Sequence, residues 1–589
     1  MVSHNAASPS HALAGVPAPA VRDAIDRLVA VQALPRLYAR DPSLWSDDPE
    51  VQARIRDRLG WLDPAGAQPE WTAQLSALLT QAQHDGFTHA LLLGMGGSSL
   101  AAEVWAHVGG VQPGGLSVAI LDSTHPDAVR AALHDADLTH TLIVVASKSG
   151  STIETACFAA TAAGLLSSPP AVSTDSTDAT HATHMVAITD SGSGLAQQAD
   201  AEQWRALLRN PADIGGRFSA LSLFGMVPAA LLGLDIAAIW AAAKTMVDAH
   251  SPGPSAEDVH EEGTADAPGV QLAAFMAGHA QHGRDKLTLL LPPTWEALGD
   301  WIEQLVAEST GKQGHGIVPI VGEPLGPAST YGDDRAFVAY QVAGQDDADI
   351  AALMQALAAL GHPVLTLAVP SPTHLGAEFM RWEIATALAG VLLGVNPFDE
   401  PNVTEAKEQT SAILAQVPTT PVSPVSEASQ SVQAVQAVQE QLAALFARLR
   451  PGDYVALQAY LPPESTTKAQ FAQARTALRD VCGVASTFGW GPRFLHSTGQ
   501  LHKGGADNVL VVQLVDDTLA DPTREPVLIP GRPYDFATLL QAQAQGDLEA
   551  LKNRGRRVDQ LRIGGDSQVA AVAKAISAAA AGAGNVRDR

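Results

Sequence analysis

The sequence has little cysteine, little positive charge and no long apolar run. Its two cysteines, Cys157 and Cys482, are too few and too far apart for a disulfide framework or a cysteine-based metal cluster. We interpret both as small buried side chains. Apolar stretches such as 384–395 are shorter than the ~20 residues that a membrane span needs, and no signal peptide is expected. We therefore expect a cytoplasmic protein with no membrane partner.

Basic residues are scarce relative to acidic ones. There are 36 Lys and Arg against 62 Asp and Glu, which gives a formal net charge of −26. Nucleic-acid-binding proteins usually carry a basic patch, and the longest basic run here is the short stretch 554–557. No nucleic-acid partner is expected. An anionic substrate remains possible, provided that its site supplies local positive charge.

Hydrophobic residues make up 46% of the 589 residues, enough for a sizeable core. Two series of short apolar strands alternate with helices, which favours parallel sheets covered on both faces. The first series has strands at 88–93, 116–121, 141–146 and 185–189. The second has strands at 287–291, 317–321, 337–342 and 364–369, with helices at 295–309 and 373–395, the latter apolar all round and hence expected to be buried.

These patterns predict an α/β protein with two doubly wound parallel-sheet units and a C-terminal α/β extension. Residues 1–20 are expected to be an irregular end, and Ser/Thr/Pro-rich stretches at 167–183 and 251–268 are interpreted as a surface insertion and a boundary. The expected division is an N-terminal helical segment (1–85), a first α/β domain (86–250), a second (269–412), a Pro/Ser linker (413–430) and the extension (431–589).

A glycine loop, GMGGSS at 94–99, follows the first strand of the first series. Glycines there let backbone amides approach a ligand, and the start of the next helix favours an anion. The loop also resembles a dinucleotide-binding turn, with Asp122 as a ribose-binding acid, although Ser99 stands at the position of the third glycine. A tight turn with a serine cap is the ordinary alternative.

The third strand ends in a hydroxyl-rich loop, SKSGST at 147–152. Hydroxyls and free amides can wrap the oxygens of a phosphate monoester. A helix start with Glu154 in support needs fewer hydroxyls than this loop carries. Since a dinucleotide fold places its phosphate loop after the first strand, this position favours a sugar phosphate.

Two further motifs carry groups for proton chemistry. In GGRFS at 215–219, Arg217 stands beside two glycines and could stabilise an oxyanion in a water-poor site. Gln304 and Glu308 are four residues apart, so they share one helix face, and Gly311 marks the end of that helix. One carboxylate can move a proton between adjacent carbons without a metal or a nicotinamide. Each motif could also be an ordinary surface turn or helix end.

Two late motifs add more polar groups. NPFDEPNVTEAK at 396–407 ends in Lys407, which could bind a sugar ring oxygen or a phosphate, or be a surface lysine. HSTGQLHKGG at 496–505 places two histidines, His496 and His502, in a polar, Gly-rich loop, and histidine can pass protons near neutral pH.

Together these motifs resemble the phosphoglucose isomerase family, whose two sugar-isomerase (SIS) units enclose the site. GMGGSS, SKSGSTIET (147–155), GGRFS, ESTGK (308–312) and NPFDEPNVTEAK occur in the family's order. The chain is most similar to the isomerase half of bacterial transaldolase–isomerase fusions, but no transaldolase half is visible. The resemblance implies cofactor-free, metal-free interconversion of glucose 6-phosphate and fructose 6-phosphate, and a homodimer.

The resemblance also implies roles for individual residues. Glu308 would be the base that acts through an enediolate, and Arg217 would stabilise its charge. Gln304 would position the substrate, and Lys407 would assist ring opening. The substrate and its phosphate would be held by Gly97, Ser98, Ser147, Lys148, Ser149, Thr152 and Gly216.

Two positions depart from the family pattern. The Gly-rich stretch between the Glu and Lys motifs, 331–337, lacks the usual ring-opening histidine, so we assign that role to His496, with a partner-supplied histidine as an alternative. Glu400 stands where the family often has glutamine, which places an extra carboxylate near the substrate.

Rival interpretations are a non-catalytic sugar-phosphate sensor with the SIS fold and an NAD-dependent dehydrogenase. Activity on mannose 6-phosphate is left open.

Overall fold

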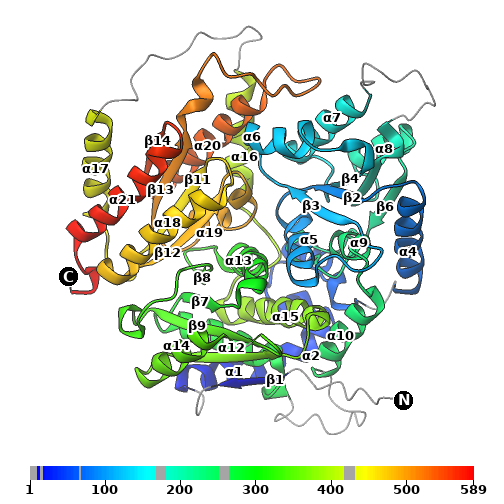
Figure 1. The fold of residues 1–589 in the computed structure, drawn as a ribbon. Helices are drawn as coiled ribbons and strands as arrows, with labels where there is room; N and C mark the ends of the chain where they lie inside the picture. The colour runs from blue at the N-terminus through cyan, green and yellow to red at the C-terminus, as the bar shows by residue number, and fades with distance from the viewer. Residues whose placement is uncertain are drawn as a thin grey trace, which may run out of the picture.

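Each of the three expected α/β regions contains its own mainly parallel sheet. The computed structural model describes residues 10–13, 18–64, 68–167, 181–250, 264–345, 347–416 and 432–588. We call the regions around the three sheets the first unit, the second unit and, for residues 432–588, the C-terminal unit. In Figure 1 the first unit is mainly blue to cyan, the second is mainly green with dark-blue N-terminal elements beside it, and the C-terminal unit is yellow to red. The predicted fold class is therefore confirmed.

The first sheet is parallel throughout, in the order β3-β2-β4-β5-β6. The chain places β3 on one side of β2 and then returns to place β4 on the other side, which creates a topological switch point between β2 and β4. The strands are β2 (His89–Leu93), β3 (Ser117–Leu121), β4 (Thr141–Ala146), β5 (Met185–Asp190) and β6 (Ala206–Asn210). Helices α4 (Gln68–His84), α5 (Leu100–Val104), α6 (Pro126–Val129), α7 (Ile153–Ser167), α8 (Gly194–Ala201) and α9 (Leu223–Leu231) belong to this unit.

The second sheet has the order β1-β10-β9-β7-β8, and only β1 is antiparallel. Its strands are β1 (Ser10–Leu13), β7 (Lys286–Leu290), β8 (Val318–Ile320), β9 (Arg335–Val342) and β10 (Val364–Val369). The expectation that residues 1–20 are irregular was wrong at 10–13, because this segment gains its backbone hydrogen bonds from β10, a partner that the local pattern does not reveal.

Helices surround and fill the second unit. The buried helix predicted at 373–395 is confirmed as α15 (Leu375–Leu393), which packs against three other helices of this unit. The helices of the unit and the N-terminal helices that accompany it are α1 (Pro19–Ala30), α2 (Ala33–Tyr38), α3 (Pro49–Arg56), α10 (Ile236–Asp248), α12 (Pro268–Gln281), α13 (Glu296–Thr310), α14 (Ala348–Ala359) and α15. The next helix in the chain, α16 (Val403–Ala415), packs against α20 (Phe536–Asn553) of the C-terminal unit.

The sheet of the C-terminal unit is parallel, with the order β12-β11-β13-β14. It has the same switch-point arrangement as the first sheet. Its strands are β11 (Tyr454–Tyr460), β12 (Ala485–Trp490), β13 (Val509–Asp516) and β14 (Arg557–Ile563). Its helices are α17 (Val432–Phe446), α18 (Ser465–Ala477), α19 (Gly499–Gly504), α20 (Phe536–Asn553) and α21 (Asp566–Ala583).

Several predictions fall partly or wholly outside the described residues. These include most of the insertion at 167–183, of the boundary at 251–268 and of the linker at 413–430. The domain boundaries remain predictions. Within the described ranges, no helix combines the length and the apolar character that crossing a bilayer requires. In the same ranges, no three His, Cys, Asp or Glu side chains are grouped to hold a metal ion.

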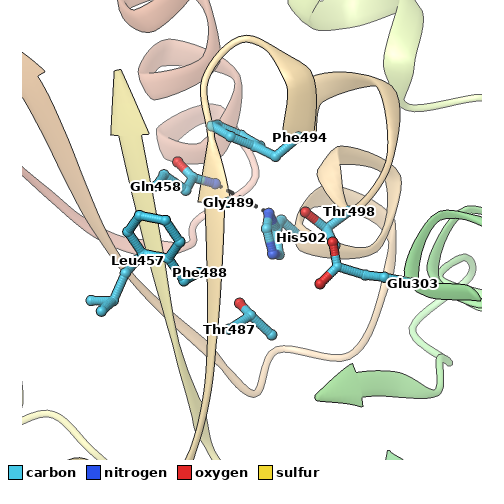
Figure 2. Close-up of a pocket in the computed structure, with 9 residues that line it drawn as sticks. All are labelled: Glu303, Leu457, Gln458, Thr487, Phe488, Gly489, Phe494, Thr498 and His502. Atoms are coloured by element: carbon cyan, nitrogen blue, oxygen red, sulfur yellow. Dashed lines mark hydrogen bonds between the residues drawn. The ribbon is translucent and has the colours of Figure 1, made fainter. Parts of the chain in front are cut away.

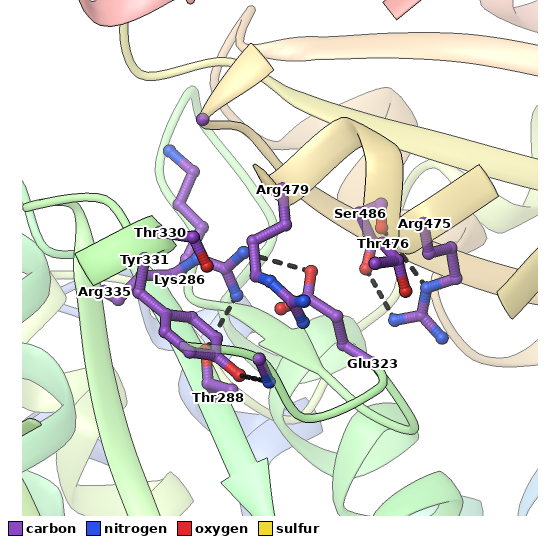
Figure 3. A network of polar contacts seen from close by, with 12 residues as sticks. Lys286, Thr288, Glu323, Thr330, Tyr331, Arg335, Arg475, Thr476, Arg479 and Ser486 are labelled. Carbon is purple, nitrogen blue, oxygen red and sulfur yellow. Dashed lines mark hydrogen bonds and ion pairs between the residues drawn. The ribbon is translucent and has the colours of Figure 1, made fainter. Parts of the chain in front are cut away.

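A buried arginine joins the C-terminal unit to the second unit. Arg475 of α18 donates to the carbonyl oxygens of Val321 (2.9 Å) and Gly322 (2.8 Å), which follow β8, and to Ser486 O (2.7 Å) in β12. Figure 3 shows this guanidinium beside Arg479 and Glu323, at the junction of the two units. Because Arg475 is only 3% exposed, its donors satisfy carbonyls that have little access to water.

We expect Arg475→Gln to loosen this junction. The variant leaves buried carbonyl oxygens without a donor, and each such group costs about 1–3 kcal/mol. The midpoint of thermal unfolding, followed by circular dichroism, should fall by several degrees. Arg562→Gln is the matched control, because the Arg562 side chain is 67% exposed in the same unit. Equal midpoints for the two variants would contradict this interpretation of the junction.

Candidate functional site

The candidate site lies at the switch point of the first sheet. In open α/β sheets, ligands bind in the crevice beyond the carboxyl ends of the two strands that flank this point. Here those strands are β2 and β4, and the loops that follow them are 94–99 and 147–152. Two motifs identified independently in the sequence therefore follow the two strands that flank the switch point.

The glycine loop is the meeting point of all three units. A Cβ atom on Gly97 would come within 2.1 Å of the Gly216 carbonyl oxygen, so the loop can contact the GGRFS motif only through glycine. Gly96 has a φ of +53°, and a Cβ atom there would lie 2.7 Å from the carbonyl oxygen of His496 and 2.8 Å from Nε2 of Gln304. Close backbone approach is a common use of glycine. Ser98 is half-buried in the same loop.

The serine loop presents hydroxyls directly before α7. Ser147 is buried and donates to Oγ1 of Thr152 at 3.2 Å. Ser149 and Ser151 are exposed, and their hydroxyl oxygens lie 2.9 Å apart. Hydroxyls in front of a helix N-terminus suit an anionic group.

Lys148 is directed differently from its neighbours. Its Nζ atom forms an ion pair with Asp190 at the end of β5 and donates to the Ala212 carbonyl oxygen at 2.9 Å. Its charge is therefore compensated by the protein, and a direct contact between Lys148 and a phosphate would require this pair to open.

Glu308 and Arg217 form the charged centre of the site, and both are buried. The Arg217 NH1 group lies 3.5 Å from Oε1 of Glu308 and 3.1 Å from Oε2 of Glu400. The remaining donors of Arg217 bind Ser309 Oγ at 2.8 Å and two backbone carbonyls of the 396–400 loop. The guanidinium is thus held on several sides while one edge remains beside Glu308.

Gln304 lies beside Glu308 on one face of α13, as the spacing predicts. Its Nε2 atom donates to Glu308 Oε2 at 3.2 Å and to the His496 carbonyl oxygen at 2.7 Å. Gln304 therefore connects the carboxylate of the second unit to the C-terminal unit.

The surroundings of Glu308 change the pKa of its carboxyl group. Burial raises its pKa above the ordinary value; Arg217 opposes this rise and Glu400 adds to it. A second buried cation, Lys312, was not assigned a role from the sequence. Its Nζ atom donates to the carbonyl oxygen of Asn396 at 2.7 Å, and burial together with the nearby Arg217 lowers its pKa to about 8. A carboxylate with two adjacent cations is equipped to exchange a proton and to stabilise new negative charge.

His496 enters the site from the C-terminal unit of the same chain. Its Nε2 atom lies 3.0 Å from Oε1 of Glu154 in α7, which also accepts a 2.7 Å hydrogen bond from Gln543. Burial favours protonation of Glu154, but His496 outweighs that effect and lowers the pKa of this carboxyl group. The sequence suggested Glu154 only as support for the helix start, whereas its main partner is 342 positions away.

Lys407 and Gln500 lie at the edge of this arrangement. Lys407 is exposed on α16, close enough to Glu154 to help lower its pKa. Gln500, which the sequence did not single out, is fully buried. Its side chain donates to Gly311 O at 2.9 Å and accepts from the Asn402 N–H at 2.8 Å. It thereby ties the end of α13 to the segment before α16.

The second histidine of the late motif, His502, belongs to a different environment. Figure 2 shows it in a small enclosed cavity beside Gln458, with Glu303 opposite. Gln458 Nε2 lies 3.1 Å from His502 Nδ1, and burial lowers the pKa of His502 to about 3. This histidine is neutral at physiological pH and packs near Tyr454, so it differs from His496 in its surroundings.

The comparisons with known proteins point to one family. Residues 78–312 match the family model described as phosphoglucose isomerase. A glucose-6-phosphate isomerase from Thermosynechococcus vestitus is 29% identical over 64% of this chain and 74% of its own. One from Rubrobacter xylanophilus is 28% identical over 62% of this chain and 92% of its own. The crystal structure of a glucose-6-phosphate isomerase from Chlamydia trachomatis shares the fold, with 19% identity, a TM-score of 0.50 and coverage of 68% of this chain and 86% of that one.

Glu303, which lines the cavity beside α13, should make the stability of the folded protein depend on pH. Burial, with Asp300 nearby, raises the pKa of Glu303 to about 8 from an ordinary 4.5. Between these values the folded chain holds a proton that the unfolded chain releases, so stability falls as pH rises, by about 1.4 kcal/mol per pH unit. We expect Glu303→Gln to remove this loss.

Thermal midpoints at pH 5.5 and 7.5 test this expectation. The midpoint of the wild type should fall relative to that of Glu303→Gln as the pH rises. Glu296→Gln, an exposed position on the same helix (side chain 55% exposed), should follow the wild type. A Glu303→Gln variant with the same pH response as the wild type would show that Glu303 is ionised in the folded protein.

Proposed function

The chain belongs to the phosphoglucose isomerase family, and we propose that it interconverts glucose 6-phosphate and fructose 6-phosphate with Glu308 as the proton-transferring base. The observation that carries this proposal is the position of Glu308. It is buried beside Arg217 and Lys312, and Gln304 links it to the turn whose His496 contacts Glu154, just after the serine loop. The reaction needs one base and a means of stabilising negative charge, and this site supplies both.

The phosphate of the substrate is held by the serine loop in this proposal. Ser147, Ser149 and Thr152 offer hydroxyls, and the start of α7 offers backbone N–H groups. Gly97, Ser98 and Gly216 form the wall toward which the sugar extends. The net charge of the chain is −26, so this local arrangement of donors is what admits a phosphate dianion.

Ring opening is assigned to His496. Its imidazole, whose Nε2 atom lies 3.0 Å from Oε1 of Glu154, can pass a proton to the ring oxygen while the hydroxyl at the anomeric carbon loses its proton. Lys407, whose charge acts on the same Glu154, assists from the edge of the crevice. We assign this histidine to the same chain as Glu308, because Gln304 donates both to Glu308 and to the His496 carbonyl oxygen; a histidine supplied by a partner is the alternative.

Isomerisation then follows on the open chain. Glu308 removes the proton from C2 of the aldose and returns it to C1, through a cis-enediolate. Arg217 and Lys312 stabilise the negative charge on the enediolate oxygen, and Gln304 fixes the orientation of the carboxylate. Reversal of the same steps converts the ketose to the aldose. Homodimer formation and a cytoplasmic location stay part of the proposal.

The dehydrogenase alternative meets a specific difficulty. It requires Asp122 to bind a ribose hydroxyl, but the carboxylate of Asp122 lies 3.2 Å from Arg493 in an ion pair. The sensor alternative has no use for a buried base at the crevice, and it is distinguished from the enzyme by the substitution described next.

We expect Glu308→Gln to lose about 10²–10⁴-fold in turnover, the range typical of a missing general base. The amide keeps the size of the side chain but cannot accept the C2 proton. The measurement is conversion of fructose 6-phosphate to glucose 6-phosphate by metal-stripped protein. Glu296→Gln on the same helix is the control and should retain full activity. Full activity of Glu308→Gln would show that another residue is the base. An inactive wild type would contradict the isomerase proposal itself.

Glu400 gives a prediction for the pH dependence. Its negative charge raises the pKa of Glu308, and the base must be ionised to act. Replacing Glu400 with Gln should therefore lower the pKa of Glu308 and shift the acid limb of kcat/KM to lower pH. Glu408→Gln, an exposed change on α16, should leave the limb in place. If the acid limb of Glu400→Gln stays in place or moves to higher pH, Glu400 does not raise the pKa of the base.

A further inference from the structure

Arg493 lies in the same short turn as His496 but has no part in the mechanism above. The turn spans Arg493–His496 and follows β12. The guanidinium is surrounded by three carboxylates. Its NH1 group lies 3.2 Å from Asp122 Oδ2, and its NH2 group lies 3.4 Å from Asp300 Oδ2 and in closer contact with Glu103. The side chain of Arg493 is 16% exposed.

Each of these carboxylates belongs to an element that carries part of the site. Glu103 is in α5, directly after the glycine loop, and Asp122 follows β3 in the same sheet. Asp300 is in α13, one helical turn before Gln304. Arg493 thereby connects the histidine-bearing turn to the elements that position the glycine loop and the base.

The cluster contains more negative charge than one arginine can balance. Burial and the neighbouring carboxylates raise the pKa of Asp122 to about 6, against the opposing effect of Arg493. Lys468 acts weakly on Glu103 and Asp300, so Arg493 is the main cation that holds these groups together. Without it, three carboxylates would face one another and repel.

The turn that holds Arg493 also contacts the site, through its backbone and through the side chain of His496. The carbonyl oxygen of His496 accepts the 2.7 Å hydrogen bond from Gln304, and the same oxygen is closely approached by Gly96. The imidazole of His496 in turn reaches Glu154. A shift of the turn would therefore move the imidazole relative to both Glu154 and Gln304.

We propose that Arg493 is a positioning residue for ring opening, which holds the turn so that His496 reaches the ring oxygen. This inference rests on the proposed isomerase function. It requires that loss of Arg493 impairs the step performed by His496 far more than the proton transfer performed by Glu308.

The two steps can be separated with a substrate that has no ring. Fructose 6-phosphate closes its ring through the hydroxyl on C5, so 5-deoxyfructose 6-phosphate stays open and needs no ring opening. Exchange of a C1 hydrogen with D₂O, followed by NMR, reports Glu308 chemistry on both compounds. For Arg493→Gln we expect a loss on the order of 10²-fold with fructose 6-phosphate, as for a displaced catalytic group, and no comparable loss with the 5-deoxy compound.

The controls distinguish positioning from general damage. Arg524→Gln removes a different arginine of the C-terminal unit, which pairs with Asp127 of the first unit. This variant should affect both substrates equally. If Arg493→Gln does not fold, Arg493→Lys is measured instead, since it keeps the charge but cannot contact three carboxylates through a planar group.

Equal losses on the two substrates, or no loss on either, would overturn the positioning role while leaving the isomerase proposal intact. Failure of the wild type to exchange hydrogen with either substrate would instead overturn the proposed function, and this inference with it.

Discussion

The contact between Arg217 and Glu308 is the interaction on which the rest of the structure depends. A buried carboxylate is costly unless a cation and hydrogen bonds compensate it, yet burial is also what makes it a useful base. Arg217 comes from the first unit and Glu308 from the second, so the pair forms only when the two units are packed together. Gly96 allows the first unit to approach Gln304 of the second unit closely, and Gly97 lets the glycine loop contact the GGRFS motif within the first unit.

In the proposed mechanism, the C-terminal unit completes the site. It contributes His496, and its Gln543 and Gln500 hold Glu154 and the end of α13, respectively. Buried Arg475 fastens the same unit to the second sheet. His496 follows Lys407 in the chain, yet it lies beside Glu154 of the first unit. The position of a motif in the sequence therefore does not decide which residues it meets in the fold.

Much of the fold could be predicted because the central strands are short, apolar and separated by helices. The strands at 141–146 and 364–369 were predicted to the residue. β6, β12 and β14 were missed, because β6 (ALLRN), β12 (ASTFGW) and β14 (RVDQLRI) mix polar residues or glycine with apolar ones and none forms a continuous apolar run. β1 depends on pairing with β10, which no local pattern encodes. The spacing of Gln304 and Glu308 predicted that they share one helix face, which the structure confirms, whereas the contacts of Glu154, Lys312 and Gln500 depend on partners distant in sequence.

The central claim is that one chain assembles the whole site, with the base and the ring-opening histidine in cis. Co-expression of Glu308→Gln and His496→Ala chains carrying different tags, with purification on both tags, tests it most directly. The account predicts that such mixed assemblies convert fructose 6-phosphate no faster than the sum of the two variants measured separately. Substantial recovery of activity would contradict it, because an intact site could then form only from the base of one chain and the histidine of another.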